Sequence, residues 1–141
     1  AQWYLTKGST TERCKAVLCL MSMRSSAWWF AMPVPIDLVP DYLEVIHHPI
    51  DYSNVRTRLK SGYYKSMDTF ASDMRLIFHN AIEYNWWPQH ECHIAAKEGL
   101  RVFEAYFAVA SRSCGDGRRW DDTTRTRYMS AAASLLMMSF G

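Results

Sequence analysis

The stretch EYNWWPQHE, residues 83–91, separates two runs of helical spacing and ends the first of them at Tyr84 and Asn85. Two tryptophans and a proline follow at once, and proline cannot continue a helix. Asn85 then has two interpretations. It caps the helix, because Asn tolerates left-handed backbone geometry, or its amide is a hydrogen-bonding group aimed into a pocket.

Apolar spacing predicts a helix on each side of this stretch. The helix before it runs from Ser66 to Tyr84 and carries one apolar face: Phe70, Met74, Ile77, Phe78 and Ala81. The helix after it runs from about Glu91 to Ser111 with matching spacing: Ala96, Leu100, Phe103 and Phe107. Two long helices joined by a short turn indicate neighbours in a helical bundle.

Two further helices are predicted earlier in the chain. The first starts near Thr11, a candidate cap, and its apolar residues recur at i, i+3, i+4 and i+7: Cys14, Val17, Leu18 and Met21. The other is short, begins after the cap Asp51 and stops at Gly62. No strand pattern is convincing. The fold class is therefore all-α, with a further helix over 121–140 as an addition.

A long apolar loop, residues 25–50, joins the first two helices. Prolines at positions 33, 35, 40 and 49 deny it a helix. A loop of this length in a compact domain is usually functional or disordered, and this one is too apolar for disorder. We expect it to pack against the bundle and line a site.

The composition of the chain excludes several classes of function. The chain has 141 residues, 49% hydrophobic and 21% charged, which fits one globular domain. The net charge of +2 does not indicate nucleic-acid binding, and no apolar run reaches the ~18 residues of a membrane span. We see no signal peptide. The four cysteines lack metal spacing and are expected to be reduced intracellular thiols. A chain that starts at Ala1 is expected to be a piece of a longer protein.

Four motifs, in order, resemble a known family: WWFAMPV (28–34), VPDYLEVIHHPIDY (39–52), LIFHNAIEYN (76–85) and AAKEGLRVFEAYF (95–107). Together they resemble a bromodomain. The resemblance covers roughly residues 11–112, between an N-terminal tail (1–10) and a C-terminal extension (113–141). It implies a left-handed four-helix bundle that recognises acetylated lysine in histone tails and other proteins. The short loop resembles that of bromodomains attached to histone acetyltransferases.

The resemblance also implies an acetyl-lysine site. Asn85 would bind the acetyl carbonyl, and Tyr42 would hold a water beside the ligand. Trp28 and Phe30 match a hydrophobic shelf, with Trp29 in place of the usual proline. Glu91, counted from Asn85 without a gap, matches the residue beside the lysine stem, where the family usually has an apolar side chain. The remaining expected wall residues are Pro33, Val34, Val39, Ala81 and Tyr84.

Elementary chemistry supports the same expectation. Acetylation turns an ammonium into a neutral amide, and an apolar pocket with one neutral donor selects that form. Residues 25–55 include acidic side chains but no Lys or Arg. We therefore expect an acidic rim that suits a basic peptide. The expected rim residues are Asp37, Asp41, Glu44, Trp86 and Trp87.

Two other functions are weighed. The same fold could act as a protein–protein scaffold that no longer reads acetylation, and Trp29 and Glu91 favour that alternative. A metal site or Cys–His hydrolase at His90, Cys92 and His93 lacks further ligands and an orienting residue.

We therefore expect a monomeric nuclear chromatin reader without catalytic residues, metal or cofactor, whose partner is an acetylated histone tail or other acetylated protein. Neither direct nucleic-acid binding nor a membrane is expected. The 129–140 apolar stripe is either a helix on the bundle or a linker to a neighbouring domain.

Overall fold

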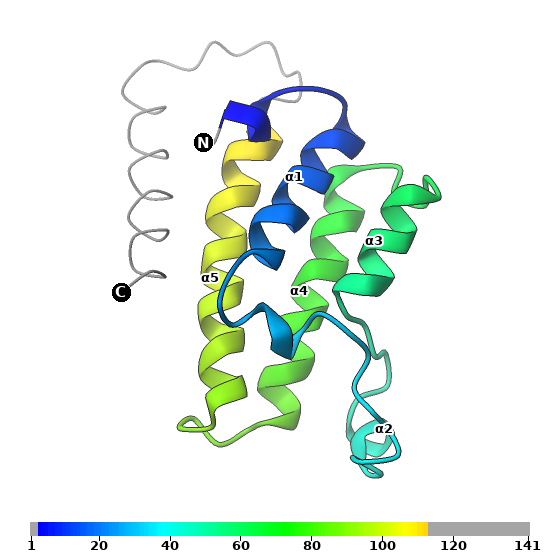
Figure 1. The fold of residues 1–141 in the computed structure, drawn as a ribbon, viewed down its shortest axis with the longest axis vertical. Helices are drawn as coiled ribbons and strands as arrows, with labels where there is room; N and C mark the ends of the chain where they lie inside the picture. The colour runs from blue at the N-terminus through cyan, green and yellow to red at the C-terminus, as the bar shows by residue number, and fades with distance from the viewer. Residues whose placement is uncertain (1–2, 113–141) are drawn as a thin grey trace.

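The computed structural model describes residues 3–112, and within that range the protein is helical and has no strand. Four longer helices lie side by side in Figure 1: α1 (Thr10–Ser22), α3 (Tyr52–Lys60), α4 (Met67–Tyr84) and α5 (Glu91–Arg112). A short helix α2 (Tyr42–Val45) lies at the lower end of that view, in the connection from α1 to α3. The expected all-α bundle is therefore confirmed.

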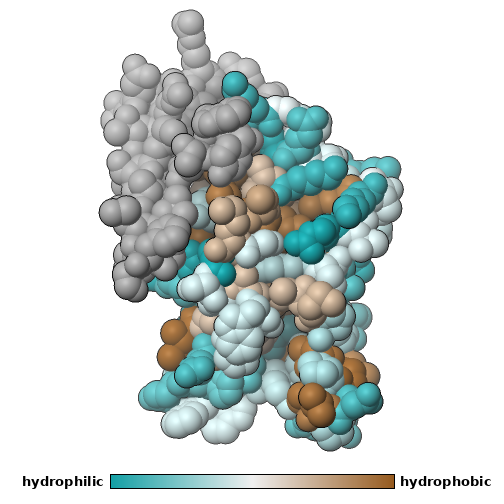
Figure 2. Space-filling view, in the orientation of Figure 1, coloured by the Kyte–Doolittle hydropathy of each residue, from teal (hydrophilic) through white to brown (hydrophobic). Residues whose placement is uncertain are grey.

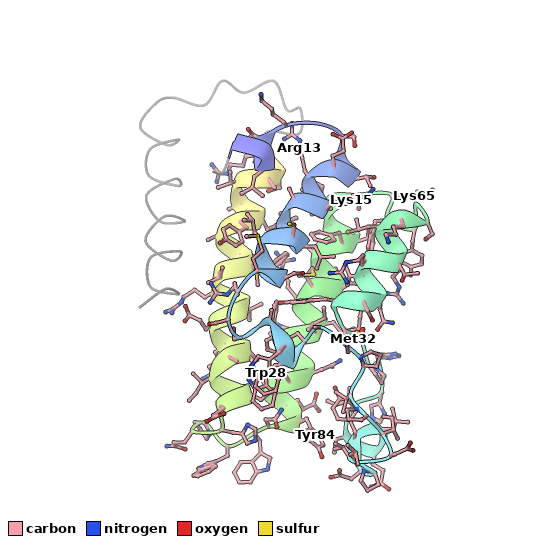
Figure 3. All side chains as sticks on the ribbon, in the orientation of Figure 1. Arg13, Lys15, Trp28, Met32, Lys65 and Tyr84 are labelled. Carbon is pink, nitrogen blue, oxygen red and sulfur yellow. The ribbon has the colours of Figure 1, made fainter. Side chains whose placement is uncertain are left out.

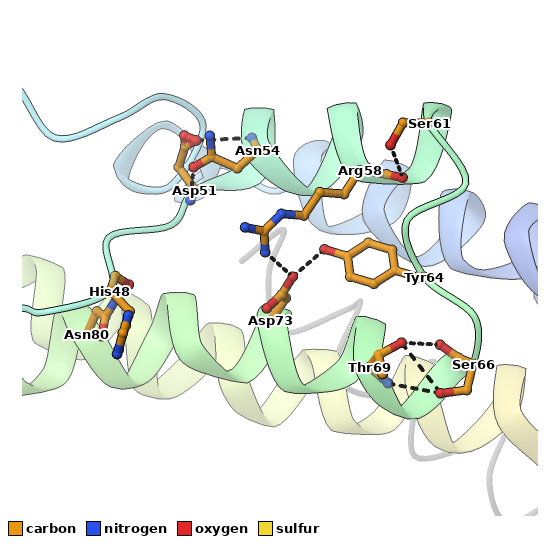
Figure 4. Close-up of polar contacts among 10 residues, drawn as sticks. All are labelled: His48, Asp51, Asn54, Arg58, Ser61, Tyr64, Ser66, Thr69, Asp73 and Asn80. Atoms are coloured by element: carbon orange, nitrogen blue, oxygen red, sulfur yellow. Dashed lines mark hydrogen bonds and ion pairs between the residues drawn. The ribbon is translucent and has the colours of Figure 1, made fainter.

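Side-chain caps set where three of these helices begin. Ser9 accepts a hydrogen bond from the Glu12 amide at 3.2 Å at the start of α1. Asp51 and Asn54 form a reciprocal capping box at α3, and Ser66 accepts from the Thr69 amide at α4 (Figure 4). Such caps satisfy amides that have no partner within the helix. The expected cap of α3 is confirmed, whereas the cap of α1 is Ser9 and not Thr11, because Ser9 and Glu12 have the Ser-x-x-Glu spacing of a helix start.

The core joins η1 and the four longer helices, and it includes large aromatic side chains from α3, α4 and α5. Its largest fully buried aromatic members are Tyr52, Phe70, Phe78, Phe103 and Tyr106. Gly99 of α5 lets the two helices approach, because a Cβ at that position would lie 2.6 Å from the Phe78 ring. The predicted apolar face of α1 is buried as expected, and so are four of the five predicted residues of α4, whereas Ala81 of α4 and Leu100 of α5 are only partly buried.

Polar contacts tie the connections to α4, as Figure 4 shows. Arg58 and the Tyr64 hydroxyl both donate to one carboxylate oxygen of Asp73, each at 2.6 Å. The buried Asn80 donates from Nδ2 to the His48 carbonyl at 2.8 Å. These bonds hold the α3–α4 turn and the end of the long loop in place.

The long loop departs from the expectation in one respect. It contains two short helical segments, the 3-10 helix η2 (Ala27–Trp29) and α2, where no helix was expected. The expectation of a helix-free loop was wrong because each proline restricts only itself and the residue before it, which leaves positions 27–29 and 42–45 free to turn.

The N-terminal residues contribute to the core. A 3-10 helix η1 (Trp3–Thr6) contacts α1 and α5, and its Leu5 is fully buried. No periodic signal in so short a segment could predict this. The predicted helix over 121–140 and Cys114 lie outside the described residues.

Of the cysteines within residues 3–112, Cys14 and Cys92 are buried and Cys19 is exposed. The same residues include no cluster of three or more potential metal ligands. None of the helices in this range is long and apolar enough to cross a membrane.

Candidate functional site

A cavity of about 340 Å³ opens at the end of the bundle, where the long loop meets the C-terminal end of α4 and the start of α5. Figure 3 labels Trp28, Met32 and Tyr84, which lie around this end of the molecule. The cavity is mostly apolar, and the side chains that line it come from the loop, α2, α4 and α5. The long apolar loop therefore packs against the bundle and lines a cavity.

One face of α4 forms a wall of the cavity. Ile77, Ala81, Tyr84 and Asn85 line it at positions i, i+4, i+7 and i+8, which fall on one side of a helix. Asn85 ends the helix with φ −95°, outside the left-handed region. Asn85 is therefore the C-cap of α4 without left-handed backbone geometry, and it also lines the cavity.

Two hydrogen bonds fix Asn85. Its Nδ2 donates to the Ala81 carbonyl at 3.0 Å, and its backbone N–H donates to the same oxygen at 3.0 Å. The side-chain amide has two N–H groups, so this bond to Ala81 uses only one of them. The side-chain amide is thereby held against the end of α4, at a residue that lines the cavity.

Two tyrosines meet across the cavity wall. The rings of Tyr42 and Tyr84 pack edge to face with centroids 4.9 Å apart. The Tyr84 hydroxyl donates to Asp41 at 2.7 Å, which raises the pKa of Tyr84. Burial raises the pKa of Tyr42, so its hydroxyl stays protonated and can donate or accept a hydrogen bond at neutral pH.

The aromatic segment 28–30 forms a second wall. Trp28 and Trp29 stack with centroids 4.0 Å apart, and Trp29 meets His90 edge-on at 6.1 Å. Phe30 is buried, and its carbonyl accepts a hydrogen bond from the Tyr52 amide at 2.8 Å. The short η2 turn is thereby anchored to α3.

The structure brings nine of the ten expected site residues to the cavity, and these are Trp28, Phe30, Pro33, Val34, Val39, Tyr42, Ala81, Tyr84 and Asn85. Glu91 is exposed at the first position of α5 and does not line the cavity. The next residue, Cys92, is buried and does line it. Counting from Asn85 without a gap therefore gives Glu91, which is one residue before Cys92, the residue that lines the cavity.

None of the expected rim residues lines the cavity. Asp37, Asp41 and Glu44 are exposed. Trp86 and Trp87 are also exposed, at 76% and 57%, so neither is part of the core.

Several lining residues were not expected from the sequence: Trp29, Met32, Pro35, Ile50, Asp51, Ile77 and Cys92. Ile77 could have been found, because it lies one and two helical turns before Ala81 and Asn85. Cys92 could not, since its place depends on the path of the α4–α5 turn. Burial raises the pKa of its thiol from 9.0 to about 11, so it is a neutral wall group at physiological pH.

The structure is thus a helical bundle with an apolar cavity at one end and an asparagine at the cavity wall. The protein-family model described as "Bromodomain" matches residues 14–98, more than half of the chain. The chain belongs to the bromodomain family, whose members are generally acetyl-lysine readers in chromatin proteins.

Curated relatives agree with this assignment. "Bromodomain adjacent to zinc finger domain protein 2B" of Homo sapiens is 43% identical over 51% of this chain and 3% of its own length. "Transcription factor GTE10" of Arabidopsis thaliana is 39% identical over 71% of this chain and 10% of its own. "Histone acetyltransferase GCN5" of Yarrowia lipolytica is 46% identical over 49% of this chain and 15% of its own length. The chain thus spans only a small part of these relatives.

Proposed function

We propose that the cavity binds the side chain of acetylated lysine and that Asn85 is the residue that recognises the acetyl group. The observation that carries the proposal is the position of the Asn85 amide at an apolar cavity, with one N–H of Nδ2 bonded to Ala81. The second N–H is then directed to the carbonyl oxygen of the ligand. Tyr42 orients a water that bridges to the same oxygen, a contact nearly as favourable in enthalpy as a direct bond.

The cost of removing a charge from water makes the cavity selective for acetylated lysine over unmodified lysine. An unmodified lysine would bring an ammonium group against Phe30, Val34 and Ile77, at a cost of several kcal/mol unless it lost its proton. The cavity offers no free carboxylate as compensation. Asp51, the lining acid, is 3% exposed and accepts hydrogen bonds from the Ser53 hydroxyl and the Asn54 amide. A neutral acetamide avoids this cost.

The proposal extends to the setting of the domain. Residues 11–112 form a non-enzymatic, monomeric reader in a nuclear chromatin protein, with an acetylated histone tail or another acetylated protein as its partner. The exposed acids Asp37, Asp41 and Glu44 attract basic residues that flank the acetylated lysine.

Matched histone-tail peptides, acetylated and unmodified, test the proposal when they are titrated into the protein by calorimetry. We expect saturable binding of acetylated peptides and at least a tenfold weaker response to the unmodified ones. Equal binding of both forms would favour the scaffold alternative, in which the fold is kept and acetylation is not read.

A further inference from the structure

A second groove lies between α1 and α3 and shares no residue with the cavity at the end of the bundle. Its volume is about 310 Å³. The lining side chains are Lys15, Leu18, Cys19, Ser22, Arg56, Leu59 and Lys60. Figure 2, in the orientation of Figure 1, shows hydrophobic surface between these two helices with hydrophilic side chains on either side.

The groove is apolar at its base and basic at its edges. Leu18 and Leu59 are the buried apolar members. Lys15, Arg56 and Lys60 are exposed, and the lining includes no acid. The whole of α3 carries no Asp or Glu to balance its charge.

These cations differ from several other arginines in the described residues, which have carboxylate partners. Arg58 is ion-paired with Asp73, Arg75 with Glu104, and Arg101 with Glu98. Within residues 3–112, the three cations of the groove have no carboxylate partner. Arg56 makes only a 3.4 Å hydrogen bond to the Ser22 hydroxyl.

We propose that this groove docks an acidic peptide segment of a protein partner, with one large apolar side chain seated on Leu18 and Leu59 and carboxylates paired with Lys15, Arg56 and Lys60. Acidic charge on the partner complements the unpaired cations, and the volume suits a Leu or Phe side chain. A nucleic-acid backbone would use the cations but leave the apolar base unused. The groove and the acetyl-lysine site can then be occupied together.

The probe is a fluorescein-labelled peptide of sequence EDDFEDLLDE, measured by anisotropy with the full chain at low salt. The variant Lys15→Glu/Lys60→Glu is compared with Lys65→Glu/Lys97→Glu, which makes the same change in net charge at exposed lysines outside the groove. We expect the first variant to lose at least tenfold in affinity and the second to lose less than threefold. Circular dichroism of each variant establishes that both are folded.

Cys19 reports whether the peptide occupies the groove, because it is exposed and lines it. The bound peptide should slow alkylation of Cys19 by iodoacetamide, followed by peptide mapping, at least threefold. A control peptide with Ser in place of Phe and Leu should protect much less. The proposal is overturned if both double variants lose affinity equally, if Cys19 is not protected, or if a short DNA duplex binds with the same dependence on Lys15 and Lys60 while the acidic peptide does not.

Discussion

The ring of His93 in the first turn of α5 lies 2.6 Å, through Nδ1, from the backbone carbonyl oxygen of Asn85 at the end of α4. A carbonyl oxygen can only accept, so Nδ1 carries the hydrogen and donates it. His93 is buried, and its Nε2 has no partner among the residues that the structure describes. This bond links the two helices directly behind the residue proposed to hold the acetyl group.

His93 is therefore expected to act as a positioning residue for Asn85. His93→Leu should reduce affinity for an acetylated peptide about three- to tenfold, because the Asn85 backbone loses a hydrogen bond of about 1 kcal/mol and its amide is less well oriented. His93→Asn keeps a donor close to the place of Nδ1 and should recover most of the affinity. If His93 contributes only to stability, both variants should change the melting temperature and should bind the acetylated peptide with the same affinity as each other.

Asn85→Ala should leave the fold intact and remove most binding. It deletes the donor to a buried carbonyl oxygen, which costs about 1–3 kcal/mol, or roughly 10- to 100-fold in affinity. Gln89→Ala removes an exposed amide from the same turn and serves as the control. Unchanged affinity in Asn85→Ala, measured by calorimetry, would refute the assignment of the cavity.

Binding of basic acetylated peptides should weaken as salt rises, because exposed charges are screened over a Debye length of ~8–10 Å. Asp37→Asn with Glu44→Gln should flatten this dependence while leaving the bond between Asp41 and Tyr84 in place. The matched control, Glu12→Gln with Asp68→Asn, removes two exposed acids from the first turns of α1 and α4 and should keep the wild-type salt dependence. Affinity that is independent of salt in the wild type would rule out an attractive rim.

The wall beside the lysine stem should respond to substitution at Cys92 and not at Glu91. Cys92→Ile adds apolar surface inside the cavity and should tighten binding about fourfold, at ~0.8 kcal/mol per added carbon in contact with the ligand. Glu91→Ile should change affinity for a singly acetylated, otherwise uncharged peptide by less than twofold, because Glu91 is exposed. A larger effect of Glu91→Ile than of Cys92→Ile on affinity would mean that Glu91 turns inward when the ligand binds.

Cys92 also predicts a pH dependence of stability. Its thiol ionises near 9.0 in the unfolded chain but only at about 11 when folded, so the unfolded state binds fewer protons between these values. The stabilising contribution is complete below pH 9 and is lost as pH rises toward 11. Urea unfolding across this window should show a steeper decline for wild type than for Cys92→Ala. Parallel declines would show that the thiol is not shielded from water.

Much of the fold follows from local sequence. Asp51, Ser66 and Gly62 are signals that act within a few residues, and each marks a helix end in the structure. The spacing of Phe70, Met74, Ile77 and Phe78 likewise fixes the buried face of α4. Such features depend on hydrogen bonds and side-chain directions within one or two turns, so the sequence is sufficient to predict them.

The composition of the cavity depends on longer distances. Asn85, Tyr42 and Val34 were expected at the site from a resemblance of motifs, and the structure brings them to one cavity. Whether Glu91 or Cys92 faces that cavity depends on how the α4–α5 turn is packed.

By itself, the sequence determined the all-α class, the ends of α3 and α4 and the apolar character of the long loop, because caps, prolines and helical periodicity act locally. Only the tertiary structure decided that Leu5 enters the core, that Cys92 replaces Glu91 at the cavity wall and that His93 holds the Asn85 carbonyl. Each of these depends on where separate segments meet in space. A rotation of one residue about a helix start moves a side chain by about 100°, and no local pattern specifies that rotation.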